Sequence, residues 1–201
     1  MQPATGVESR ATLSEVARLV NERATPAIEM PAWEVNYVSL GNIASNTGEL
    51  VDFAPVLGSH ILSSSPKFRK GDLLYGRMRP YLNKVWLAEF DGVCSGEAIV
   101  LRPDLRRTDP CYLQAILLSE LTLDQIVPYQ TGTSLPRVPT QRVLKVQILL
   151  PNLKRQREIG REVAKRREHA KYLRAKAETT LSEAKERVEQ MILGNATDAT
   201  H

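Results

Sequence analysis

The C-terminal part of this chain is a segment without proline. All twelve prolines lie at or before Pro151, and only one glycine, Gly160, occurs between Lys154 and Leu193. Glu, Lys, Arg, Ala and Leu dominate the segment, and these residues lose least on entering a helix. The sequence therefore predicts one long helix over residues 152–193. At about 1.5 Å per residue it would extend for roughly 60 Å, further than the diameter of a domain of about 150 residues.

A narrow apolar seam runs along this predicted helix. Its members recur mostly at steps of three and four, which is typical of a coiled coil, although Arg166 fills one seam position and an extra step of four falls near Leu181. The seam consists of Ile159, Val163, Ala170, Leu173, Ala177, Leu181, Ala184, Val188 and Met191. Twelve Lys or Arg against seven Glu leave the outer face basic. We expect dimerisation with a second long helix; the alternative is a solvated helix packed on its own domain.

Length and composition bound the rest of the chain. With 201 residues and 42% hydrophobic content, the chain can hold one domain, residues 1–151, followed by the helix and a short disordered tail, residues 194–201. Neither a run of about 18 apolar residues nor a signal-peptide core is present, which predicts a soluble cytoplasmic protein with no membrane contact. Cys94 and Cys111 are too few and too far apart for a zinc site, and they fit reduced, buried thiols better than a disulfide scaffold. The net charge of +4 permits a nucleic-acid partner without requiring one.

Short strands and short helices are expected to alternate in the domain, which predicts the α+β class. After a loose leader, residues 1–10, Thr12 and Glu15 form a possible capping box for a helix whose apolar face would run from Leu13 to Val20. Asp109 and Pro110 suit the first positions of another helix. The expected strands include residues 33–40, 73–75, 85–88, 98–101 and 146–150, and Thr140 is expected to cap one more turn of helix before the last of them.

Two polar loops are the candidate DNA contacts. The first, residues 76–84, places three cations and a tyrosine between two predicted strands, and the second covers residues 129–137. Their Arg, Lys, Thr and Ser side chains suit phosphate oxygens, and Arg and Gln also suit base edges in the major groove. The candidate residues are Arg77, Arg79, Tyr81, Lys84, Gln130, Thr131, Thr133, Ser134 and Arg137.

Catalytic motifs are absent from the sequence. No phosphate-binding glycine-rich loop occurs, and His60, His169 and His201 lack partners at metal-ligand spacing. Residues 109–112 superficially resemble the Asp/Asn-Pro-Pro-aromatic motif of amino-methyltransferases, but Cys111 occupies the third position. We therefore predict no catalytic residue, no metal site and no cofactor in this chain.

The order of the pieces resembles the target recognition domain of the specificity subunits of type I restriction-modification systems. The resemblance covers roughly residues 37–193. It is carried by GDLLYGRMRPYLNKV at residues 71–85, by GVCSGE at 92–97 before the apolar residues 98–101, and by DPCYL at 109–113. The glycine-containing loop 131–137 and ILLP at 148–151, with Gln156 and Ile159 following, complete it.

The resemblance implies a DNA-recognition subunit without catalytic activity. In that family two recognition domains are held apart by two antiparallel helices, and each domain reads one half of a split site in double-stranded DNA. Partner methyltransferase and restriction subunits carry S-adenosylmethionine, ATP and Mg. This chain has one domain and one helix, so it would be a half-subunit that forms a homodimer through its helix as an antiparallel coiled coil, or that pairs with another half.

Three alternatives remain open at this point. The chain could be a coiled-coil assembly or scaffold protein that does not bind DNA, or the specificity module of another type of restriction-modification system. A self-sufficient nuclease or methyltransferase is the third, and the missing cofactor and metal motifs argue against it.

Overall fold

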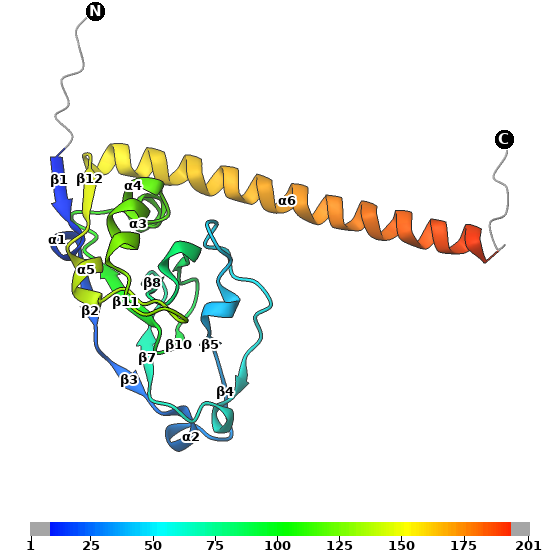
Figure 1. Ribbon diagram of the computed structural model, residues 1–201, viewed down its shortest axis with the longest axis horizontal. Helices are drawn as coiled ribbons and strands as arrows, with labels where there is room; N and C mark the ends of the chain where they lie inside the picture. Colours follow the sequence, from blue (N-terminus) through cyan, green and yellow to red (C-terminus); the bar gives the residue numbers. More distant parts are fainter. Residues whose placement is uncertain (1–8, 194–201) are drawn as a thin grey trace, which may run out of the picture. The chain divides into compact units, whose positions relative to one another are not determined.

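The computed structural model describes residues 9–193. The chain divides into two compact units, Met1–Arg161 and Glu162–His201, of which the first mixes strands with short helices and the second continues one long helix (Figure 1). The predicted α+β class and long helix are confirmed, and this helix, α6, spans Leu153–Ile192. The predicted tail and most of the predicted leader lie outside the described residues.

An antiparallel sheet of four strands forms the centre of the first unit. Its order is β2-β11-β8-β9. On the inner strand β11, Val100 pairs with Val20 on one side and with Leu74 on the other. The four strands are β2 (Ala17–Val20), β8 (Leu73–Gly76), β9 (Val85–Leu87) and β11 (Ala98–Pro103).

The other strands of the first unit form three further sheets. The largest has the order β3-β7-β10-β5, and within it only β10 and β5 run parallel. Its strands are β3 (Arg23–Ala24), β5 (Tyr37–Val38), β7 (Ser65–Phe68) and β10 (Gly92–Cys94). The other two are antiparallel pairs, β4 (Glu34–Val35) with β6 (Val56–Leu57), and β1 (Ser9–Thr12) with β12 (Gln147–Leu150).

Short helices connect and cover these sheets. The α-helices are α1 (Leu13–Val16), α2 (Pro26–Glu29), α3 (Pro110–Leu117), α4 (Glu120–Ile126) and α5 (Thr140–Leu144). The 3-10 turns are η1 (Leu40–Asn42), η2 (Gly58–His60), η3 (Pro80–Leu82) and η4 (Val127–Tyr129).

Both faces of the central sheet are buried. Leu73 and Tyr75 of β8 pack into a core shared with α3, α4 and α5, whereas Leu74 points to the opposite face and joins a second core with Phe68 and Trp86. Successive side chains of a strand point to opposite faces, so a strand buried on both sides is apolar throughout. The sheet therefore supplies rigid strands, and the polar residues are left to the loops at their ends.

The N-terminal region differs from the prediction. The capping box is present, because the Glu15 carboxylate accepts a hydrogen bond from the Thr12 amide at 2.6 Å. The helix ends at Val16, however, and Ala17–Val20 is a strand, so the expected helical face up to Val20 is wrong. Pairing with β11 satisfies this backbone and buries Val20, and tertiary pairing of this kind overrides a weak local preference. Ser9 and Arg10, expected in a loose leader, belong to β1.

The first turns of α6 are anchored within the first unit. Gln156 is 1% exposed, and its side chain bonds the backbone of Arg107, Asp109 and Pro151. Gly160 is also buried against the start of α3. The predicted cap of α3 is confirmed, since the Asp109 carboxylate accepts from the Tyr112 amide at 3.0 Å. Thr140 begins α5 but does not cap it, because the capping position is Pro139.

Candidate nucleic-acid interface

The two loops predicted to contact DNA are hydrogen-bonded to each other. The Arg79 amide donates to the Pro136 carbonyl at 2.6 Å, and the Val138 amide donates to the Arg77 carbonyl at 2.9 Å. Residues 77–84 connect β8 to β9, whereas residues 130–139 lie between η4 and α5. Loops far apart in the sequence thus form one continuous surface.

The second loop is a small hairpin. The backbones of Thr131 and Arg137 exchange two hydrogen bonds, of 2.9 and 2.8 Å, which close the loop. Gly132 has φ +94°, a left-handed conformation that glycine adopts without a steric penalty. Thr133 and Ser134 lie inside this closed loop and are exposed. The hairpin therefore presents two hydroxyl groups on a short, constrained backbone.

The first loop holds its exposed residues on a constrained backbone as well. Arg79 and Asn83 flank η3 and both have positive φ, 49° and 47°. The Asn83 side chain fixes the second of these bends by donating to the Leu118 carbonyl at 2.8 Å. Tyr81 is 48% exposed, and the Arg79 guanidinium is exposed with no hydrogen bond or ion pair to any residue within 9–193.

Glu97, which precedes β11, lies between the two loops. Its carboxylate receives Nε of Arg137 at 3.0 Å and Nη2 of Arg137 at 2.8 Å, and Nε of Arg77 lies 3.7 Å away. The Glu97 carbonyl also accepts from the Arg77 amide at 3.0 Å. The hydrogen bonds from Arg137, followed by its charge and that of Arg77, lower the pKa of Glu97, so the group is a carboxylate at neutral pH.

Three predicted contacts have side chains that are bonded or buried within the domain. The Lys84 ammonium donates to the Leu40 carbonyl at 2.5 Å, and partial burial lowers its pKa. Gln130 has its side-chain oxygen buried without a hydrogen-bond partner. Thr131 uses its hydroxyl in a long contact of 3.4 Å with the Arg137 carbonyl. These three side chains shape the loops more than they extend from them.

A shallow hollow of about 340 Å³ lies beside Arg77. Arg23, Asn21 and Thr140 contribute polar atoms to it, and β2 and β11 supply its apolar floor. Arg23 donates from Nε to the Ser64 hydroxyl at 3.0 Å, which orients its guanidinium. The sequence alone did not predict Asn21 and Arg23 in this hollow, or Glu97 between the two loops, because each comes from a segment outside those loops.

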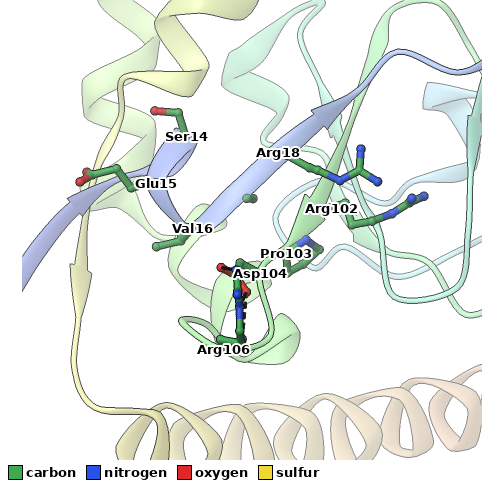
Figure 2. A pocket seen from close by; sticks show the side chains of 9 residues that line it. Ser14, Glu15, Val16, Arg18, Arg102, Pro103, Asp104 and Arg106 are labelled. Carbon is green, nitrogen blue, oxygen red and sulfur yellow. Dashed lines mark hydrogen bonds and ion pairs between the residues drawn. The ribbon is translucent and has the colours of Figure 1, made fainter.

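Figure 2 shows a second hollow, of about 380 Å³, formed by α1, β2 and residues 102–106. Arg106 pairs there with Asp104 at 3.0 Å, and Arg102 pairs with the buried Asp72 through two contacts of 2.7 Å. Arg18 lines the same hollow. Most of the positive charge here is neutralised locally, so the hollow is a weaker anion site than its arginine content suggests.

The predicted dimerisation seam lies on α6. Ile159 falls in the part of the helix that belongs to the first unit, and it is half-buried there. The larger seam residues of the second unit are solvent-exposed in the single chain: Leu173 is 50%, Leu181 63% and Val188 53% exposed. The smaller seam residues are Val163, Ala170, Ala177 and Ala184, of which the first two are half-buried and the other two exposed. This stripe leaves apolar surface for a partner helix.

Over residues 9–193, the structure contains neither a helix of the length and apolarity needed to cross a membrane nor a cluster of three or more His, Cys, Asp or Glu side chains suited to a metal ion.

Comparison with known proteins gives a consistent result. No protein-family model matches the sequence. The specificity subunit of the type I restriction enzyme EcoDI from Escherichia coli is 28% identical over 127 residues, which are 63% of this chain and 28% of that protein.

Solved structures extend the similarity to nearly the whole chain. The HsdS subunit from Thermoanaerobacter tengcongensis matches 96% of this chain and 50% of its own length, with 26% identity and a TM-score of 0.71. The S subunit of a type I system from M. genitalium, at 14% identity and a TM-score of 0.63, shares the fold over 94% of this chain and 47% of its own.

In both fold and sequence, the chain is similar to type I restriction-modification specificity subunits. More particularly, it is similar to one half of such a subunit, with one α+β domain and one long helix, and it spans about half the length of the solved structures it matches.

Proposed function

We propose that this chain is a sequence-specific DNA-recognition subunit of a type I restriction-modification complex. It binds double-stranded DNA and directs partner methyltransferase and restriction subunits to a split site. It is not itself an enzyme, because the partner subunits bind S-adenosylmethionine, ATP and Mg and carry out catalysis. The similarity to HsdS and to the EcoDI specificity subunit supports this role.

The observation that carries the proposal is the hydrogen-bonded union of loops 77–84 and 130–139. It places Arg79, whose guanidinium has no partner among residues 9–193, on the same surface as Tyr81 and the hydroxyls of Thr133 and Ser134. Arginine and hydroxyl groups bind phosphates, and arginine also reads guanine edges. We assign DNA contact to these four residues together with Arg77 and Arg137, and a supporting role to Lys84, Gln130 and Thr131.

A binding assay tests the proposal. Methylome sequencing of a host carrying this chain and its methyltransferase defines the target, and target and random duplexes are then titrated against the assembled complex between 50 and 200 mM salt, a range over which phosphate contacts are strongly screened. Arg79→Ala should weaken binding and, if Arg79 contacts a phosphate, reduce the salt slope by about one. Arg106→Ala, at another exposed arginine, which lines the second hollow, is the control and should bind as wild type does.

Two results would contradict parts of this proposal. A wild-type complex that retains no duplex at low salt would contradict DNA recognition and favour a scaffold role. Unchanged affinity, specificity and salt slope in Arg79→Ala would remove Arg79 from the contact surface.

The half-subunit dimerises through the seam on α6, as an antiparallel coiled coil. A two-fold axis between two identical domains would make the recognised site a split palindrome. If the chain instead pairs with a different half-subunit, the two halves of the methylated site will differ in sequence.

A further inference from the structure

The carboxylate of Glu97 is an unexpected group on a surface proposed to bind a polyanion. It is 27% exposed and lies at the junction of loops 77–84 and 130–139. Its negative charge repels phosphate groups. Neither loop contains this residue, since it precedes β11. Its contacts with Arg137 and Arg77 indicate its role on this surface.

Glu97 fixes the orientation of the Arg137 guanidinium. Nε and Nη2 of Arg137 both donate to the carboxylate, and Nη1 donates to the Leu135 carbonyl at 3.1 Å. A planar guanidinium held at three nitrogens has a defined direction, so its remaining N–H groups can point only to fixed positions. The 43% exposure of the Arg137 side chain leaves that edge accessible.

Glu97 also engages the first loop. Its carbonyl accepts from the Arg77 amide, and Nε of Arg77 lies 3.7 Å from its carboxylate. One residue therefore joins both loops by backbone and side chain. Its charge also offsets part of the positive charge of Arg77 and Arg137, which weakens their attraction for phosphate.

We infer that Glu97 is a positioning residue for base discrimination: it orients Arg137 toward base edges, and its charge reduces sequence-independent binding. This inference rests on the proposed DNA-recognition function. A pairing that only stabilised the domain would alter stability and leave the ratio of target to random affinity unchanged.

The exchange Glu97→Gln tests this, because it removes the charge while nearly preserving side-chain shape. In the assembled complex, random-duplex affinity should rise, and the ratio of target to random affinity should fall by about tenfold, the discrimination expected of one oriented bidentate contact. Glu158→Gln is the matched control, since Glu158 also pairs with an arginine, Arg155, at 3.2 Å but lies on α6. It should leave the ratio unchanged.

A double-mutant cycle with Arg137→Gln distinguishes positioning from independent effects. If Glu97 acts through Arg137, the double variant should lose no more discrimination than Arg137→Gln alone, because the two residues act as a unit. Additive losses, or an unchanged ratio in Glu97→Gln, would overturn the inference. Glu97→Asp retains the charge and should recover part of the discrimination, which keeps the test decisive if the glutamine variant is unstable.

The proposed DNA recognition and the proposed role of Glu97 are contradicted by different results. A wild-type complex that does not prefer its target refutes DNA recognition itself. A wild-type complex that discriminates, with an equally discriminating Glu97→Gln variant, refutes only the role of Glu97.

Discussion

The side-chain oxygen of Gln156 accepts a hydrogen bond from the backbone amide of Asp109 at 3.0 Å. This contact joins the first turn of α6 to the residue that caps α3. The amide group of the same side chain donates to the carbonyls of Arg107 and Pro151 at 3.1 and 2.7 Å. One buried glutamine thus satisfies three backbone groups from two segments.

Replacing Gln156 by leucine should lower the free energy of unfolding by about 3 kcal/mol, because it leaves buried backbone groups without partners. Urea denaturation followed by circular dichroism would measure the change. Gln141→Leu, an exposed glutamine in α5, is the control and should behave as wild type. Equal midpoints for the two variants would show that water replaces the lost bonds.

Gly160→Ala should destabilise the domain, although alanine is the better helix former by about 1 kcal/mol. A Cβ at Gly160 would lie 2.8 Å from the Asp109 carboxylate and 3.1 Å from Cβ of Cys111, so α3 and α6 must separate. We expect a net loss of about 1–2 kcal/mol in the free energy of unfolding. Thr179→Ala, at an exposed site of the same helix, should not lower stability. A gain in stability for Gly160→Ala would contradict the close packing.

Two Arg–Asp pairs of similar geometry should differ in their contribution to stability. Asp72 is 2% exposed and accepts two hydrogen bonds from Arg102 and one from the Arg69 amide. Asp72→Ala should therefore reduce the free energy of unfolding by about 3 kcal/mol. Arg106→Ala breaks the solvated pair with Asp104 and should be indistinguishable from wild type in thermal unfolding. Similar losses in both variants would mean that burial does not decide the difference.

Leu181→Glu should convert the proposed homodimer to a monomer, because it places a charge in the apolar seam of α6. Thr179→Glu adds the same charge about 200° around the helix, away from the seam, and should remain dimeric. Sedimentation equilibrium gives both masses. A wild-type chain that is monomeric alone and associates only with a second subunit would contradict the homodimer.

Local sequence signals predicted the elements whose cause is local. The Thr12–Glu15 capping box, the Asp109–Pro110 helix start and the long helix α6 each depend on residues a few positions apart, and all three are present. The strand Ala17–Val20 was mistaken for helix because its partner, β11, lies about 80 residues away in the chain.

The candidate surface was only partly predictable for the same reason. Composition singled out both polar loops, and the structure brings them together. No pattern in the sequence indicated that the Arg79 amide would bond the Pro136 carbonyl, or that Glu97 would bind Arg137. Nor could composition show that Lys84 reaches the Leu40 carbonyl, since loop cations are more often solvated.

The pairing of β1 with β12 has a consequence for how the chain is made. The Ser9 hydroxyl donates to the Leu150 carbonyl across a separation of 141 residues. At about 5–20 residues per second, a ribosome needs roughly 7 to 28 s to synthesise that interval. During this time β1 is outside the ribosome without its strand partner, and an unpaired strand is prone to pair wrongly. The first unit can complete its fold only after Pro151 has emerged, so its biogenesis depends on β1 remaining unpaired until β12 is made.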